Sequence, residues 1–323
     1  MSGSPETRRR LRELAGAALR RYPFAVRGCS LLPESFNAVF GIDAADASRY
    51  ALRLSAAERI HPDGVEAAEL AWMEALARDG IVPVPAVTRT ADGSPWIQVA
   101  PPGSGDRRIA VLFGWVPGRP MSERPSVEGV RRAGELSALL HEDAAGEDAR
   151  PAAVPVADRV VYWRLEARFA ELRPTHGTLF DEAADAAGEA IERLWRHPPH
   201  RPHLLHGDFI PQNLIIEGDR VCVIDFQDCF WGFEAQDIAI SVTALRRLDD
   251  GERCEREFRS GYERRRPWPI PDTATLDALV AARRLHLAIV ALNLRREGFG
   301  ASVARQAGPL AEWLRGIRRP VPG

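Results

Sequence analysis

The stretch that decides the fold is HLLHGDFIPQNLIIEGDRVCVIDF, residues 203–226, in which short apolar runs alternate with polar loops. The apolar runs are typical of strands, and EGD is typical of a tight turn. Asp208, Asn213 and Asp225 fall at the ends of these runs, where bare carboxylates are costly to desolvate. Such an oxygen-rich cluster suits Mg²⁺, which takes one or two protein carboxylates and completes its shell with water and nucleotide phosphates.

Composition predicts a protein of two lobes with a sizeable core, because 45% of the 323 residues are apolar. The apolar runs are too short to span a bilayer, and the N-terminus lacks an apolar signal core, so we expect a cytoplasmic protein without a membrane partner. The net charge of -2 gives no reason to expect nucleic acid. The four cysteines lack metal-type spacing and indicate neither a zinc site nor a disulfide framework.

The N-terminal third predicts a small antiparallel sheet with one inserted helix. NAVFGI and RYALRLS form an expected hairpin, and WIQVA and RRIAVLFGWV are further extended segments. The helix is expected over residues 64–78, where Glu69 shares the apolar face with Trp72 and Leu76. An inward carboxylate needs a cation, for which Arg53 is a candidate, whereas a boundary glutamate would reach solvent.

Beyond residue 115 the pattern becomes helical, with Ser126 as a candidate N-cap and a further apolar helical stripe from Ala183 to Leu194. The predicted architecture is therefore a two-lobed α+β fold. The pattern predicts a small antiparallel β-sheet lobe at residues 1–114 and a larger, mostly helical lobe at residues 115–323.

HGDFIPQN followed by VIDF resembles the catalytic and metal-binding loops of the aminoglycoside phosphotransferase and choline kinase family, which is similar to the protein kinases. The resemblance implies a protein-kinase-like fold, with a nucleotide-binding lobe at residues 1–114 and a catalytic and substrate-binding lobe at residues 115–323. It also implies that Asp208 is the catalytic residue that orients and deprotonates the substrate hydroxyl, that Asn213 and Asp225 are Mg²⁺ ligands, and that His206 supports the loop. Asp237 would brace the loop by accepting backbone hydrogen bonds, or would act as a helix N-cap.

Other segments resemble the nucleotide-binding parts of the same family in the expected order. RYALRLS resembles the strand that contacts the phosphates, with Arg53 where many relatives have Lys, and this chain contains no lysine. AAELAWMEAL resembles the helix whose glutamate, here Glu69, pairs with that cation. VLFGWVPG resembles the hinge that binds adenine, at Phe113 and Trp115. Asn37 aligns with the glycine-free phosphate loop, and a turn-forming Asn is equally compatible.

The sequence predicts the phosphate acceptor less specifically than it predicts the reaction. Residues 241–323 contain 16 Arg against 10 Asp and Glu, an excess of six positive charges, which argues against a pocket for polycationic aminoglycosides. Solvated surface arginines are the alternative explanation. ELAWMEAL with VPVPAV resembles stress-response kinase, homoserine kinase and hydroxylysine kinase relatives, which phosphorylate hydroxyls of amino acids or of Ser and Thr in polypeptides.

Three functional hypotheses follow. The first is an ATP- and Mg²⁺-dependent kinase that acts on an alcohol of a small metabolite or natural product, with GTP not distinguished from ATP. The second is a peptide or protein Ser/Thr kinase, as in peptide natural-product maturation, whose Arg-rich lobe would dock an acidic leader. The third is a nucleotide-binding pseudokinase, which the glycine-free loop and the missing lysine would suit and the intact Asp208, Asn213 and Asp225 oppose.

Overall fold

The computed structural model describes residues 4–33, 36–100, 105–145, 150–294 and 299–317, which form a mixed α+β protein. Two compact units divide the chain: unit 1 consists of Met1–Arg59 and Glu66–Gly118, and unit 2 consists of Ile60–Val65 and Arg119–Gly323. The predicted fold class is confirmed by this architecture. The roles assigned to the lobes 1–114 and 115–323 remain predictions.

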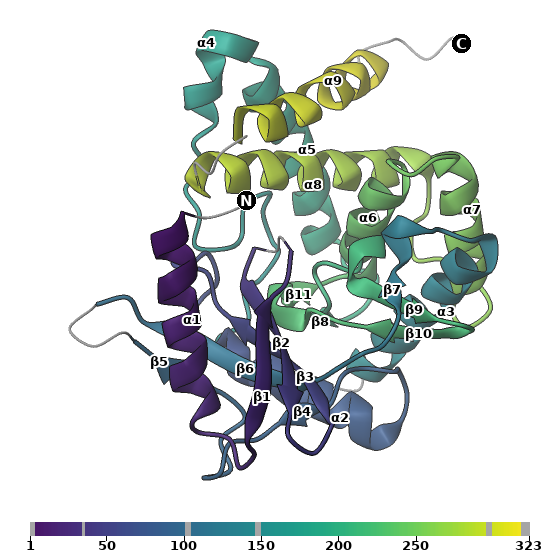
Figure 1. Ribbon diagram of the computed structural model, residues 1–323. Coiled ribbons are helices and arrows are strands. Elements are labelled where there is room, and N and C mark those ends of the chain that lie inside the picture. The colour runs from purple at the N-terminus through teal and green to yellow at the C-terminus, as the bar shows by residue number, and fades with distance from the viewer. Residues whose placement is uncertain (1–3, 34–35, 101–104, 146–149, 295–298, 318–323) are drawn as a thin grey trace, which may run out of the picture. The chain divides into compact units, whose positions relative to one another are not determined.

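Unit 1 contains a six-stranded sheet of order β1-β2-β3-β6-β4, with β5 also paired to β6, and every pair is antiparallel (Figure 1). The strands are β1 (Val26–Leu31), β2 (Ala38–Ala44), β3 (Arg49–Leu54), β4 (Val87–Thr88), β5 (Ile97–Val99) and β6 (Arg108–Gly114). The expected hairpin is β2–β3, and its partner in the sheet is the expected strand β6.

The two faces of this sheet differ because successive side chains of a strand alternate. Phe40, Leu52 and Leu112 share one face and form a buried core with helix α1 (Pro5–Leu19), which lies along the sheet in Figure 1. Ser4 begins α1 by accepting a hydrogen bond from the Thr7 amide. The opposite face carries Arg53.

Helix α2 (Val65–Asp79) forms where the apolar stripe predicts it. All five residues of that stripe are buried: Val65, Glu69, Trp72, Met73 and Leu76. Strand β1 was not predicted, since most of its side chains are exposed at the sheet edge and its sequence therefore lacks an apolar alternation.

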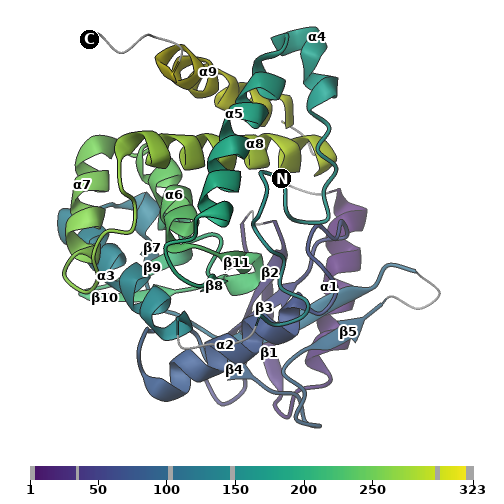
Figure 2. The same ribbon diagram turned by 180° about the vertical axis from the view of Figure 1, so that it is seen from behind.

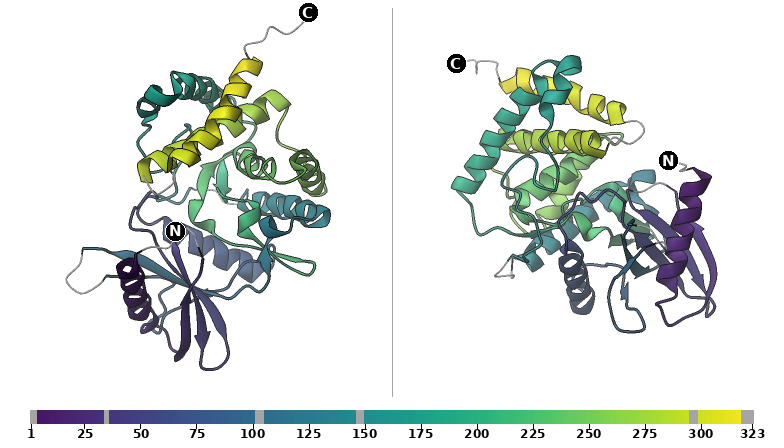
Figure 3. Two further views of the ribbon diagram at one scale, coloured as in Figure 1. Left: turned by 45° about the horizontal axis from the view of Figure 1, so that its top comes forward. Right: turned by 90° about the vertical axis from the view of Figure 1, so that its left-hand side faces the viewer.

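Unit 2 is mostly helical, and helix α8 lies at its centre. Its helices are α3 (Val127–Ala144), α4 (Arg173–His176), α5 (Leu179–Arg196), α6 (Glu234–Leu245), α7 (Gly251–Tyr262), α8 (Thr273–Leu294) and α9 (Phe299–Ile317). Helices α5, α6 and α9 pack against α8, whereas α3 packs against α7 (Figures 2 and 3). Ser126 caps α3 as expected, accepting a hydrogen bond from the Gly129 amide.

Two small sheets complete unit 2. One has the order β10-β9-β7 and the other pairs β11 with β8, and both are antiparallel. Their strands are β7 (Arg119–Pro120), β8 (His203–Leu205), β9 (Leu214–Glu217), β10 (Arg220–Val223) and β11 (Phe230–Gly232). Among the described residues, no helix combines the length and apolar character needed to cross a bilayer.

Candidate active site

The β9–β10 hairpin brings the ends of the opening sequence stretch together. Leu214 pairs with Val223, and one step further the Ile224 amide donates a hydrogen bond to the Asn213 carbonyl over 3.0 Å. Asn213 and Asp225 therefore lie at the same end of one hairpin. This closeness follows from a short turn and antiparallel pairing, which is why the sequence spacing could predict it.

Asp208 is held by two donors from different elements. The Asn213 side-chain amide donates to the Asp208 carboxylate over 2.8 Å and to its backbone carbonyl over 2.9 Å. The Arg283 guanidinium, from α8, donates to the other carboxylate oxygen over 2.6 Å. Burial, with the negative charges of Asp228 and Asp225, raises the pKa of Asp208 to about 7 although Arg283 opposes the shift.

The buried side chain of His206 fixes the loop that carries Asp208. The Nδ1 atom of His206 accepts a hydrogen bond from the Asp208 amide, so its Nε2–H donates to the Ile224 carbonyl; both distances are 3.2 Å. Burial lowers the pKa of His206, so the ring is neutral at neutral pH. His206 thus connects the loop of Asp208 to the strand that precedes Asp225.

Asp237 braces the same loop from helix α6. One carboxylate oxygen accepts a hydrogen bond from the Gly207 amide over 2.9 Å, and the other contacts His141 Nε2 at 3.2 Å. Burial is the largest single effect and acts to raise the pKa of Asp237, but the hydrogen bonds and charges around it, of which the hydrogen bond from His141 is the largest, together lower the pKa. The N-cap alternative is wrong, because Asp237 is the fourth residue of α6 and Phe233 occupies the N-cap.

Position 207 requires glycine. Its φ is +79°, and a Cβ built there would lie 2.0 Å from the Asp228 carbonyl oxygen. Asp225 also has a positive φ, of 65°, which is uncommon for a residue other than glycine and is typical of strained functional loops.

The structure adds two residues that the sequence analysis missed. Asp228 contacts His61 Nε2 at 2.7 Å. Burial is the largest single effect and acts to raise the pKa of Asp228, but the hydrogen bond from His61 and the neighbouring positive charges together lower it. Arg283 is the second residue that the sequence analysis missed. Both His61 and Arg283 are distant in sequence from the loop they contact, so no local spacing could identify them.

In unit 1, Arg53 and Glu69 form the expected ion pair. The guanidinium of Arg53 donates to both oxygens of Glu69, at 2.7 and 2.6 Å, and both side chains are buried. The ring of Phe113 lies beneath the guanidinium, with 5.3 Å between the ring centroid and the guanidinium carbon. Two acceptor oxygens, a negative charge and an aromatic face therefore fix the position of this cation.

Asn37 and Trp115, the remaining residues predicted to contact the nucleotide, make contacts with residues of unit 1. Asn37 accepts a hydrogen bond from the Ala56 amide over 3.1 Å, which joins the residue before β2 to the segment after β3. Trp115 stacks with Arg49, whose guanidinium carbon lies 4.1 Å from the ring centroid. Residues 34–35 of the expected phosphate loop lie outside the described residues.

A pocket in unit 2 borders Arg283 and thus the neighbourhood of Asp208. Its wall is aromatic and apolar, with contributions from Tyr162, Phe230, Ile240 and His286. Tyr162 stacks on His286 with 4.7 Å between ring centroids. Among the described residues that line the pocket, none is acidic and two are arginines. The charged side chains of the lining are therefore positive rather than negative, which does not favour a ligand with several positive charges.

The fold and the cluster around Asp208 define a kinase of protein-kinase-like fold. The chain belongs to the phosphotransferase enzyme family, whose sequence pattern matches residues 33–279. The suspected relationship to the aminoglycoside phosphotransferase and choline kinase-like superfamily is thereby confirmed.

Solved structures of similar fold agree with this assignment. A microcompartment-associated aminopropanol kinase is 25% identical, with a TM-score of 0.73 and coverage of 94% of this chain and 97% of the other. An amicoumacin kinase in complex with AMP-PNP, Ca²⁺ and Ami is 16% identical, with a TM-score of 0.75 and coverage of 97% and 96%. A thermostable mutant aminoglycoside phosphotransferase, in ternary complex with ADP and hygromycin B, is 14% identical, with a TM-score of 0.60 and coverage of 94% and 98%. No curated protein sequence matches the chain.

Proposed function

We propose that the chain is an ATP- and Mg²⁺-dependent kinase that phosphorylates an alcohol group of a small metabolite or natural product. The observation that carries this proposal is the Asp208 carboxylate, held between Asn213 at 2.8 Å and Arg283 at 2.6 Å. A carboxylate with two fixed donors is oriented, and orientation is the main requirement of phosphoryl transfer.

In the proposed reaction, Asp208 accepts a hydrogen bond from the acceptor hydroxyl and aims its oxygen at the γ-phosphorus of ATP. The new bond joins the acceptor oxygen to that phosphorus, the bond from the phosphorus to the β-phosphate oxygen breaks, and ADP leaves. Asp208 takes the hydroxyl proton as the new bond forms. Arg283 keeps the carboxylate in place on the side away from Asn213.

The donor set around Asp208 fits Mg²⁺. The Asn213 amide nitrogen is committed to Asp208, which leaves the amide oxygen as its ligand atom, and Asp225 supplies a carboxylate at the same end of the hairpin. Oxygen ligands of this kind are those that Mg²⁺ prefers. When bound, the ion would neutralise charge on the phosphates of the nucleotide.

Unit 1 supplies the proposed nucleotide contacts. Glu69 holds Arg53 in one orientation, as expected for a cation that contacts phosphates, and the planar guanidinium can pair with phosphate oxygens. Phe113 and Trp115 mark the proposed adenine-binding hinge; the Trp115 amide already donates to the Arg49 carbonyl over 3.1 Å, so this amide is not the proposed contact. For Asn37 a structural role is better supported, because its side-chain oxygen accepts the Ala56 amide.

The acceptor is proposed to be small and not polycationic. The pocket beside Arg283 has no acidic lining residue among those described, whereas aminoglycosides carry several positive charges. A fold neighbour is an aminopropanol kinase at 25% identity, which favours small amino alcohols for the first acceptor screen.

The peptide-kinase alternative gains less support. A surface that docks an acidic leader needs available cations, but many C-terminal arginines already pair with carboxylates of unit 2. Arg246 contacts Glu255 and Asp277, Arg264 contacts Glu135, and Arg266 contacts Glu234. These ion pairs reduce the effective positive charge of the lobe.

The test of the proposed function compares three variants. Asp208→Asn is expected to lower phosphate transfer about 10²–10⁴-fold, the usual contribution of a positioned base, while Mg²⁺ and ATP still raise its melting temperature. Asp225→Ala is expected to lose the Mg²⁺-dependent part of that thermal shift. Asp219→Ala, an exposed carboxylate in the turn of the same hairpin, is the control.

The acceptor screen uses amino alcohols, hydroxy acids, aminoglycosides and Ser/Thr peptides with radiolabelled ATP. Transfer to small alcohols that is lost in Asp208→Asn supports the proposal. Transfer only to peptides would replace it with the second hypothesis. Unchanged turnover in Asp208→Asn would reject the assigned role of Asp208.

A further inference from the structure

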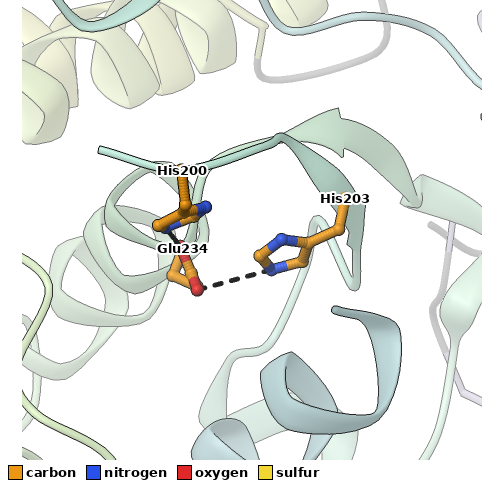
Figure 4. A group of neighbouring side chains, drawn as sticks. All are labelled: His200, His203 and Glu234. Atoms are coloured by element: carbon orange, nitrogen blue, oxygen red, sulfur yellow. Dashed lines mark ion pairs between the residues drawn. The ribbon is translucent and has the colours of Figure 1, made fainter. Parts of the chain in front are cut away.

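A second cluster of ligand-type side chains lies on unit 2, away from Asp208. It consists of His200 in the loop before β8, His203 at the start of β8 and Glu234 at the start of α6 (Figure 4). Glu234 Oε2 is 2.6 Å from His200 Nε2, and Glu234 Oε1 is 3.6 Å from His203 Nε2. One ligand atom from each residue lies within 4.8 Å of the others.

The histidine rings present lone pairs to this cluster. His200 Nδ1 lies 2.7 Å from the Arg201 carbonyl, to which only an N–H can donate, so its Nε2 is the acceptor atom in the neutral ring. His203 Nε2 has no hydrogen-bond partner and lies on the side of the Glu234 carboxylate. A histidine whose second nitrogen donates to a backbone carbonyl is the usual form of a metal-ligating histidine.

Two of the ligand atoms are buried without a hydrogen bond. His203 is 3% exposed and Glu234 is 1% exposed, and His203 Nε2 and Glu234 Oε2 have no hydrogen-bond partner. The short contact between His200 and Glu234 thus lacks hydrogen-bond geometry. Leaving buried polar atoms unsatisfied costs free energy, so the arrangement needs a further partner.

A protonated His200 would satisfy only part of the cluster. It would pair with Glu234, but His203 Nε2 would stay unsatisfied. Arg266 already donates to Glu234 Oε1 over 2.9 Å, which orients the carboxylate and leaves Oε2 turned toward His200. A divalent cation at the centre would satisfy all three lone pairs, with Arg266 as an outer-shell support.

We propose that His200, His203 and Glu234 form a binding site for a divalent transition metal of the Zn²⁺ class. Two imidazoles and one carboxylate are a ligand set that Zn²⁺ accepts in proteins, and nitrogen ligands select against Mg²⁺. His200 is partly exposed, with 37% of its side chain accessible, so water can complete the coordination from that side. The ion would connect the loop before β8 to the first turn of α6.

The experiment measures Zn²⁺ binding to the full chain by calorimetry and by thermal shift, with Co²⁺ absorption as a second probe. The wild-type protein is expected to bind one Zn²⁺ at this site and to melt at a higher temperature with the metal. His200→Ala is expected to bind Zn²⁺ at least about tenfold more weakly, since it lacks one of three ligands. His200 is at the surface, so this variant is expected to fold.

Three comparisons separate this site from others. His197→Ala removes an exposed histidine of the same segment and is expected to bind Zn²⁺ as the wild type does. Asp225→Ala is expected to keep the Zn²⁺ affinity, which distinguishes this site from the proposed Mg²⁺ ligands. Absence of Zn²⁺ binding in the wild type, or equal loss in His197→Ala and His200→Ala, would overturn the proposal. Glu234→Gln with unchanged affinity would overturn it as well.

Discussion

At the scale of single residues, Glu69 fixes the guanidinium of Arg53, the cation that is proposed to contact the nucleotide phosphates. Glu69 is fully buried and accepts two hydrogen bonds from Arg53. Removing one partner of a buried ion pair leaves the other charge uncompensated, which typically costs 3–5 kcal/mol. We therefore expect Glu69→Gln to lower the free energy of unfolding by about 3 kcal/mol, measured by urea denaturation.

The matched control for this prediction removes both charges. Because the double variant Arg53→Met with Glu69→Leu leaves no unpaired charge, it is expected to lose less stability than Glu69→Gln. A Glu69→Gln protein as stable as the wild type would show that the pair contributes nothing to the fold.

Local spacing explains which site residues could be predicted from the sequence. Asp208, Asn213 and Asp225 belong to one loop and one hairpin, so backbone geometry alone brings them near each other. Arg283 contacts Asp208 from α8, 75 residues away in sequence. An arginine in the middle of a helix has no feature that distinguishes it from a surface arginine, and only tertiary packing identifies its role.

At the scale of elements, helices α3 and α7 approach each other so closely that each requires a glycine at their contact. A Cβ on Gly134 would lie 2.0 Å from the Phe258 carbonyl oxygen, and a Cβ on Gly261 would lie 1.8 Å from the Arg131 carbonyl oxygen. The obstructing atoms are backbone and cannot rotate away. We expect Gly134→Ala to destabilise the protein by about 3 kcal/mol, measured as a loss in the free energy of unfolding.

Gly188 of α5 is the matched control for that substitution. It also lies inside a helix, but a Cβ there meets nothing within 4 Å. Since alanine has the higher helix propensity, Gly188→Ala is expected to stabilise the protein by about 0.5–1 kcal/mol. If Gly134→Ala were equally stabilising, the two helices could not be as close as described.

Element prediction succeeded where one side of an element is buried. The apolar stripe of α2 and the alternation of β2 and β3 both reflect a buried face, so their positions were predicted closely. Strand β1 is mostly exposed, and its sequence VRGCSL carries no such pattern. It forms because β2 offers an edge to pair with, which is a tertiary cause.

The stability of the whole protein should depend on pH through its buried histidines, of which His286 is the most informative. Its Nδ1–H donates to the Val160 carbonyl over 3.2 Å, and its Nε2 is buried without a partner. Burial lowers the pKa of His286 to about 3, and the positive charges of Arg283 and His61 act in the same direction, against Asp228 and the Val160 carbonyl.

The sign of the pH effect follows from the lowered pKa of His286. In the unfolded chain a histidine titrates near 6.5, so between about pH 6.5 and pH 3 the unfolded state binds a proton that the folded state does not. The contribution to stability is complete above pH 6.5 and is lost as the pH falls. From pH 7 to pH 5, His286 alone is expected to lower the free energy of unfolding by about 2 kcal/mol.

The measurement compares urea denaturation at pH 7 and pH 5 in the wild type and in His286→Gln. Glutamine can still donate a hydrogen bond to Val160 but does not titrate, so the pH-dependent loss should be smaller by about 2 kcal/mol in this variant. His197→Gln, at an exposed histidine, is the control and should lose stability as the wild type does. An identical pH dependence in all three proteins would mean that His286 binds its proton equally well in the folded and unfolded chain, and that α8 does not bury it as described.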